Sequence, residues 1–144
     1  MPRIRFYHNA GDRLAVAAAW LWQSWRQRQP VVVYTPNRAL ADRLDQMLWS
    51  QPATGFMPHC SGESSLAAET PVVLASNLDQ LPHDQTLLNL GDETPPGFSR
   101  FENLIEIVSC DDNDRQAARL RFRHYRERGY AIDTNDLSAE PQAW

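Results

Sequence analysis

The segment PVVVYT at residues 30–35 constrains the fold of this chain more than any other. An unbroken apolar run of this kind is typical of a strand at the centre of a parallel sheet, because other layers cover both of its faces. An alternating segment around Ile4 and Phe6 predicts an earlier strand. Between the two, residues 12–28 carry apolar side chains on a helical stripe about 100° wide. That stripe consists of Leu14, Ala17, Ala18, Leu21 and Trp25.

A second helix is predicted directly after the apolar run. Thr35 is suited to cap it and Pro36 to stand at its first helical position, where a missing N–H costs nothing. The order strand, helix, strand, helix predicts an α/β fold with a parallel sheet and right-handed crossovers. The buried stripe of this helix consists of Leu40, Leu44, Met47 and Leu48.

Three further apolar segments, at residues 71–76, 86–91 and 103–109, bring the expected number of strands to about five. Residues 92–101 are predicted to form a loop or a single turn. A last helix begins at the acids around Asp111 and ends at Gly129. We expect one α/β domain over residues 1–132 and a polar, loosely held C-terminal tail over residues 133–144.

Composition excludes some classes of protein. No apolar run approaches the roughly 18 residues that span a bilayer, and the N-terminal segment lacks the apolar centre of a signal peptide, so we expect a cytoplasmic protein. Cys60 and Cys110 lie far apart in the sequence, which predicts two free thiols. His59 beside Cys60 has no further ligand at a metal-like spacing, so a turn is the favoured interpretation there.

Positive charge is concentrated near the C-terminus. Residues 115–128 contain six of the fourteen basic residues and one acid, a net charge of +5. The formal charge of the chain is −4, so the remainder carries −9. A chain that is acidic as a whole does not attract phosphate over its entire surface. The sorting of charge therefore points to a local binding site on the last helix.

The arginines of the last helix form a stripe about 80° wide, with Phe122 beside it. Arginines stacked at this spacing repel one another, whereas an ordinary solvated helix interleaves glutamate. A solvated face remains the alternative, but we favour an anionic partner, because guanidinium groups hold carboxylates and phosphates bidentately. The stripe consists of Arg115, Arg119, Arg123 and Arg126.

Trp49 is predicted to project about 180° away from Leu40, on the outer side of the second helix. Two interpretations stay open for it. A neighbouring loop covers the ring, or the ring forms the wall of a binding site, where aromatic side chains are enriched.

Catalytic motifs are missing from the sequence. No GxGxxG follows the first strand, no GxxxxGK[ST] occurs, and the segment SGESS is not a GxSxG elbow. We therefore expect no intrinsic enzymatic activity, no metal and no cofactor.

Two blocks, LDQMLWSQPATGFMPH at residues 44–59 and RLRFRHYRERGY at residues 119–130, resemble the chi subunit of bacterial DNA polymerase III. The likeness runs in register from the first strand to Tyr130. It implies a three-layer α/β/α Rossmann-like sandwich with a mostly parallel sheet. It also implies a non-catalytic replication subunit that pairs with the psi subunit as a heterodimer on the clamp loader. Such a subunit holds the acidic C-terminal tail of single-stranded DNA-binding protein, and an accessory helicase is a further partner that the resemblance allows.

The resemblance carries the family's tail-binding residues over to matching positions, with Arg126 as a further candidate. Phe122 stands where a tyrosine is common, and arginine replaces lysine at Arg115 and Arg123. The tail-binding positions are Trp49, Arg115, Arg119, Phe122 and Arg123. The psi-subunit interface corresponds to Phe56, Met57, Pro58 and His59.

Two other functions remain as alternatives. The same arginines and aromatic rings suit direct binding of single-stranded nucleic acid through phosphate contacts and base stacking, although the acidic remainder of the chain disfavours it. A small nucleotide-binding enzyme is suggested by analogy of fold alone.

Overall fold

The computed structural model describes residues 2–27, 29–50, 59–61, 72–76, 78 and 84–138; for residues 49–50 and 59–61 the description covers the backbone. Seven strands form one parallel sheet in the order β3-β4-β2-β5-β6-β1-β7. The strands are β1 Arg3–Ala10, β2 Val31–Tyr34, β3 His59–Ser61, β4 Val72–Ala75, β5 Thr86–Asn89, β6 Asn103–Ser109 and β7 Ile132–Asp136. The helices are α1 Arg13–Arg26, α2 Arg38–Ser50, α3 Asp112–Glu127 and the short 3₁₀ helix η2 Phe98–Arg100.

The predicted α/β class and parallel sheet are confirmed, and β2 lies between β4 and β5 as its apolar sequence predicts. The prediction of about five strands was too low. The two additional strands, β3 and β7, lie at the two edges of the sheet. Both are short and lack an apolar run, so the hydrophobic pattern gave no signal for them.

β7 also corrects the expected C-terminal tail. Residues 133–136 pair in register with β1, from Arg5 opposite Asp133 to His8 opposite Asp136. The loosely held tail that we expected from Asp133 onward therefore does not begin at that residue. Polar side chains suit this position because the strand is an edge of the sheet and three of its five residues are exposed.

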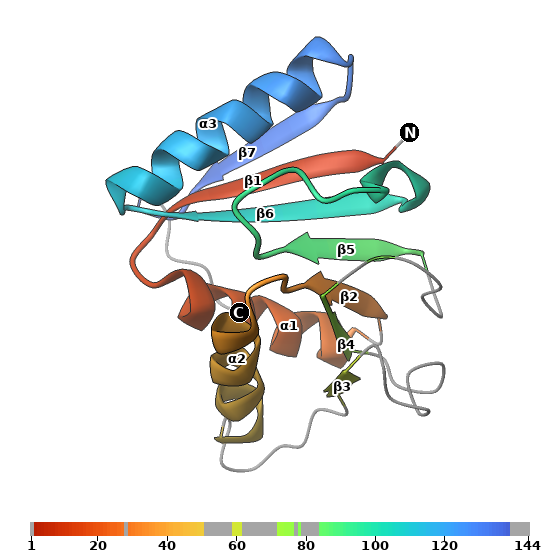
Figure 1. The fold of residues 1–144 in the computed structure, drawn as a ribbon, viewed down its shortest axis with the longest axis vertical. Helices are drawn as coiled ribbons and strands as arrows, with labels where there is room; N and C mark the ends of the chain where they lie inside the picture. The colour runs from red at the N-terminus through yellow and green to blue at the C-terminus, as the bar shows by residue number, and fades with distance from the viewer. Residues whose placement is uncertain are drawn as a thin grey trace.

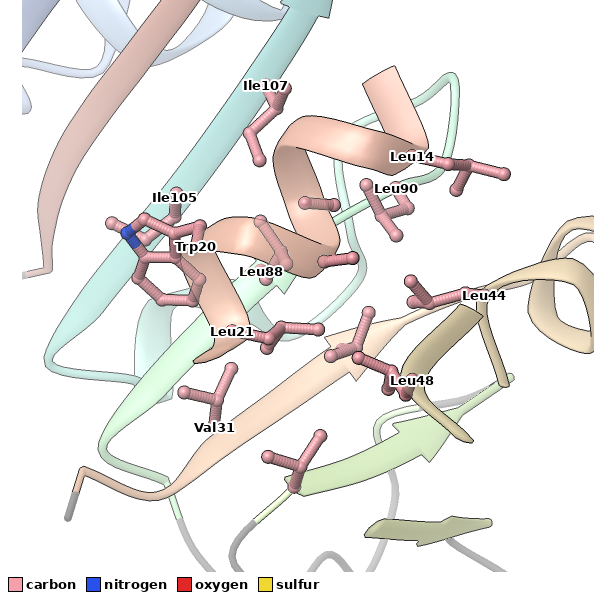
Figure 2. Close-up of a cluster of buried hydrophobic side chains, with 14 of the residues drawn as sticks. Leu14, Trp20, Leu21, Val31, Leu44, Leu48, Leu88, Leu90, Ile105 and Ile107 are labelled. Carbon is pink, nitrogen blue, oxygen red and sulfur yellow. The ribbon is translucent and has the colours of Figure 1, made fainter. Parts of the chain in front are cut away.

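Helices cover both faces of the sheet, as a three-layer sandwich requires. On one face α1 and α2 pack against alternate side chains of the strands, and Figure 2 shows Leu21 of α1 and Leu44 and Leu48 of α2 in one cluster with Val31 and Leu88 of the sheet. On the other face α3 and η2 pack against Ile4, Phe6, Val32, Leu87 and Leu104. In Figure 1 α3 and α2 lie at opposite ends of the long axis.

Short polar residues set the helix starts. The Asp12 carboxylate accepts hydrogen bonds from the backbone N–H groups of Leu14 and Ala15, and Asp111 caps α3 in the same way. The prediction that Thr35 caps α2 was wrong. Its backbone N–H donates to the Ala75 carbonyl at 2.8 Å, so Thr35 continues β2, and Asn37 accepts from Leu40 N–H at 3.2 Å instead.

The last helix ends as the sequence predicts. Gly129 has a φ of 85°, a left-handed conformation that glycine adopts without strain. In the part of the chain that the structure describes, no helix has the length and apolar character needed to span a membrane.

Candidate functional site

A cavity of about 410 Å³ lies beside the N-terminal half of α3. Three of the residues singled out in the sequence line it, namely Arg115, Arg119 and Phe122. The other lining residues come from α3 itself and from the C-terminal parts of three neighbouring strands. They are Phe6, His8 and Asn9 of β1, Val108 and Ser109 of β6, Ala118 of α3 and Thr134 of β7.

The position of the cavity follows from the order of the strands. β1 and β6 are neighbours, yet the chain leaves β1 through α1 toward β2 and leaves β6 through α3 toward β7. The two helices pack on opposite faces of the sheet. Such a reversal at the carboxyl ends of parallel strands opens a crevice, which is where open α/β sheets bind ligands.

The cavity combines an apolar floor with a cationic rim. The rings of Phe6 and Phe122 meet edge to face with centroids 5.3 Å apart. Arg115 and Arg119 are exposed, and neither makes a side-chain hydrogen bond or an ion pair with any residue that the structure describes. None of the described lining residues is Asp or Glu. The site is therefore suited to an anion that carries an apolar group.

The remaining arginines of the stripe lie outside the cavity. Arg123 and Arg126 are exposed on α3 but do not line it. The structure thus brings together half of the arginine stripe with Phe122, and the other half continues along the helix toward its C-terminus.

Arg121, on the same helix, is buried with 2% of its surface exposed. Its Nε donates to Oε2 of Glu106 at 3.1 Å, and its Nη1 donates to the Asp92 carbonyl at 2.7 Å. Glu106 lies on β6 and is itself fully buried. One of the six arginines counted as local positive charge is therefore paired inside the protein.

Two more donors complete the surroundings of Glu106. The Tyr125 hydroxyl donates to Oε2 at 2.7 Å, and Nδ2 of Asn89 lies 3.2 and 3.1 Å from the two carboxylate oxygens. Burial and the neighbouring Glu106 raise the pKa of Tyr125 far above its ordinary value, so the hydroxyl keeps its proton and donates. This cluster joins α3 to β5 and β6 through buried hydrogen bonds, and Nη2 of Arg121 is its one nitrogen without a hydrogen-bond partner among the described residues.

Arg13 and Asp114 join the beginnings of α1 and α3. Nη1 of Arg13 lies 3.5 Å from Oδ1 of Asp114, whose Oδ2 accepts from Ser109 N–H at 2.7 Å. The same guanidinium donates to the carbonyls of Ile107 and Gly91 at 2.8 and 3.1 Å. Burial lowers the pKa of Arg13, and the charge of Asp114 opposes this effect. Arg13 therefore occupies the carboxyl ends of β5 and β6.

Sequence patterns missed these buried groups and the contribution of β1. A signal for Glu106 was present, since it is the single charged residue in the segment NLIEIVS. His8 and Asn9 gave no signal, because only the tertiary structure brings them to α3.

Other predicted site residues are not placed at the cavity. Trp49 belongs to the last turn of α2, on the face of the sheet opposite α3, and its side chain lies outside the described residues. Phe56, Met57 and Pro58 also lie outside them, and His59 is described only as the first residue of β3. Within the described part of the chain, no group of three or more His, Cys, Asp or Glu side chains is arranged to hold a metal ion.

The fold and the site define a parallel α/β domain with a cationic, aromatic-floored cavity at the switch point of its sheet. Comparison of the sequence with family models matches residues 1–133 to the DNA polymerase III chi subunit, HolC. The chain therefore belongs to the chi-subunit family, whose members are accessory subunits of a DNA polymerase complex in replication.

Individual relatives agree with this assignment. The chain is 35% identical over 141 residues to DNA polymerase III subunit chi of Pseudomonas aeruginosa, covering 95% of this chain and 98% of the relative. It is 26% identical to the chi subunits of Haemophilus influenzae and Escherichia coli, over 78% of this chain in each case and 79% and 77% of the relatives.

A solved structure supports the fold alone. The C-terminal domain of Dbp5 from Saccharomyces cerevisiae aligns with a TM-score of 0.59 at 8% identity, covering 93% of this chain and 90% of that domain.

Proposed function

We propose that this chain is a non-catalytic subunit that links the clamp loader of DNA polymerase III to the acidic C-terminal tail of single-stranded DNA-binding protein. The observation that carries the proposal is the pair Arg115 and Arg119, which stand without internal partners among the described residues at the rim of an aromatic-floored cavity. We expect the protein to act in the cytoplasm, where the replisome associates it with the nucleoid.

The chemistry of the cavity suits the end of such a tail. A guanidinium fork holds a terminal carboxylate bidentately, and the floor formed by Phe6 and Phe122 accepts an aromatic ring. Ordering a flexible peptide opposes binding, so we expect a dissociation constant of micromolar order. Affinity falls as salt is added, because exposed charges are screened.

Arg123 and Arg126 continue the positive stripe beyond the cavity. We assign them to the upstream acidic residues of the tail, which they attract without a fixed geometry. Their replacement by alanine is expected to weaken binding less than that of Arg119.

Trp49 remains a prediction that rests on the family resemblance. α2 packs on the face opposite α3, so a contribution from Trp49 requires contacts outside the cavity. Trp49→Ala tests this separately: weaker tail binding supports a second contact region, and unchanged binding removes Trp49 from the site.

The psi subunit is proposed as a second partner, held by Phe56, Met57, Pro58 and His59. Residues 56–59 and α3 are separate segments of the chain. Phe56→Ala is expected to weaken psi binding while tail binding stays intact, and loss of both together would contradict two separate interfaces.

The decisive experiment is a titration of the full-length protein with a fluorescein-labelled acidic tail peptide at low salt. We expect Arg119→Ala to weaken binding about tenfold or more, because a hydrogen bond to a charged group is lost. Arg3→Ala is the matched control, since Arg3 is exposed at the opposite end of β1 and its replacement changes the net charge equally. No binding by the wild type, or equal loss in both variants, would refute the proposed site.

A naked single-stranded oligonucleotide serves as the competing ligand. Tight binding of the oligonucleotide at 50 mM salt, lost in Arg119→Ala, would instead favour direct recognition of nucleic acid.

A further inference from the structure

β1 carries a bulge where it reaches the cavity. Tyr7 is opposite Ile107 of β6 and Ala10 is opposite Ser109, so β1 has one residue more than β6 between these pairs. Asn9, which lies in the bulge, has a φ of 63°. It is the only residue with a positive φ among the described residues that are not glycine. Bulges of this kind redirect side chains and are enriched next to binding sites.

His8, just before the irregular residue Asn9, lies on the side of the sheet that faces α3. Ile4 and Phe6, at alternate positions before it, pack in the core beneath α3. His8 follows them in this alternation and lines the cavity together with Arg115 and Arg119. It is half-buried, so it is accessible to a ligand in the cavity.

Charged groups reach this part of the cavity from two elements. Arg115 and Arg119 come from α3, and Asp136 of β7 lies opposite His8 in the register of the sheet. The carboxylate of Asp136 already accepts from Asn9 Nδ2 at 2.9 Å and from the Ser138 hydroxyl at 2.7 Å. Val108 and Ser109 of β6 also line the cavity, and neither carries a charge. Among the described residues, Asp136 and the two arginines are thus the charged groups that surround His8.

We propose that His8 is a third, proton-dependent cation of this site, and that the carboxyl-terminated acidic peptide binds more tightly when the His8 imidazole is protonated. This inference rests on the proposed function and adds a residue of β1 to it. An anion held at the rim by the two arginines offsets their repulsion of the imidazolium. Binding therefore takes up a proton, and by linkage a lower pH strengthens binding.

The experiment compares tail-peptide affinity at pH 5.8 and pH 7.8 at constant ionic strength. The aspartates and the terminal carboxylate of the peptide stay ionised throughout this range. We expect the wild type to bind roughly two- to fivefold more tightly at pH 5.8, as for one partly exposed ion pair. His8→Gln keeps a hydrogen-bonding side chain without the charge and should lose this dependence. The matched control is His124→Gln on α3, a histidine that does not line the cavity, and it should keep the dependence.

Calorimetry in two buffers of different ionisation enthalpy gives an independent readout. The wild type should take up a fraction of a proton on binding near neutral pH, and His8→Gln should take up less. Peptide binding with the same pH dependence and proton uptake in wild type and His8→Gln would overturn the role of His8 while leaving the proposed function intact. Failure of the wild type to bind the peptide at either pH would overturn both.

Discussion

Arg119 and Arg121 stand two residues apart on α3 and have opposite environments. Arg121 is buried against Glu106 with a 3.1 Å contact, whereas Arg119 is exposed at the rim of the cavity and has no ion pair within the described structure. A separation of two residues turns a side chain by about 200° around a helix, so the two guanidinium groups point to different sides. An arginine-rich helix can thus fix its own position with one arginine and present others to a partner.

The two environments also differ in what a lost charge costs. A buried pair leaves an uncompensated charge when one partner is removed, whereas an exposed arginine leaves only water behind. Replacing Arg121 should therefore lower stability more than replacing Arg119 does. For tail binding we expect the larger direct effect from replacing Arg119.

The largest effect is expected for Arg121→Ala. Its removal leaves the buried Glu106 carboxylate without its cation, which costs about 3–5 kcal/mol in the free energy of unfolding. Arg119→Ala, the same substitution on the exposed side, should change this free energy by about 0.5 kcal/mol or less. Urea denaturation of both variants measures the difference, and similar free energies of unfolding for the two would refute the distinction between a buried and an exposed arginine.

A smaller effect is expected for Tyr125→Phe, which removes a single donor from Glu106 and keeps the ring. The hydroxyl contact of 2.7 Å is buried and ends on a carboxylate, so we predict a loss of about 1.5–3 kcal/mol by urea denaturation. Tyr130→Phe is the control, because the Tyr130 hydroxyl makes no hydrogen bond to a described residue. Equal stability of Tyr125→Phe and wild type would show that Glu106 does not depend on this donor.

The smallest effect concerns the fully exposed Asp136. Hydrogen bonds from Asn9 and Ser138 hold its pKa at about 2. A pKa below the unfolded value of about 3.9 stabilises the fold above pH 4, and this contribution disappears as pH falls toward 2. In an NMR titration the carboxylate should remain mostly ionised at pH 3. Asn9→Gly, which retains the positive φ and removes the donor, should bring the midpoint closer to 3.9; no shift would contradict the role of Asn9.

Much of the fold could be predicted because the core-forming segments carry strong patterns. The run PVVVYT predicted a central strand, and Asp111 and Gly129 marked the ends of α3. The edge strands could not be found in this way, because β3 and β7 pair through backbone groups and lack an apolar run. The cap of α2 was misplaced, since Thr35 serves the pairing of β2 with β4 instead.

Of the residues around the candidate site, the sequence predicted only those that belong to α3. Helical spacing grouped Arg115, Arg119 and Phe122 correctly into one face, and they do line one cavity. Spacing along one helix cannot show which strands lie beneath it, so His8, Asn9 and Thr134 were missed. Nor did the net charge reveal that Arg121 faces Glu106, because that contact joins residues of two different elements.

We propose above that the cavity between α3 and the strands β1, β6 and β7 receives an acidic peptide end. Titration of the ¹⁵N-labelled full-length protein with the tail peptide, followed by amide chemical shifts, locates the bound peptide. We expect the largest shifts on residues 8–9, 108–109, 115–122 and 134. Shifts concentrated instead on α1 and β5, with these residues unchanged, would contradict it.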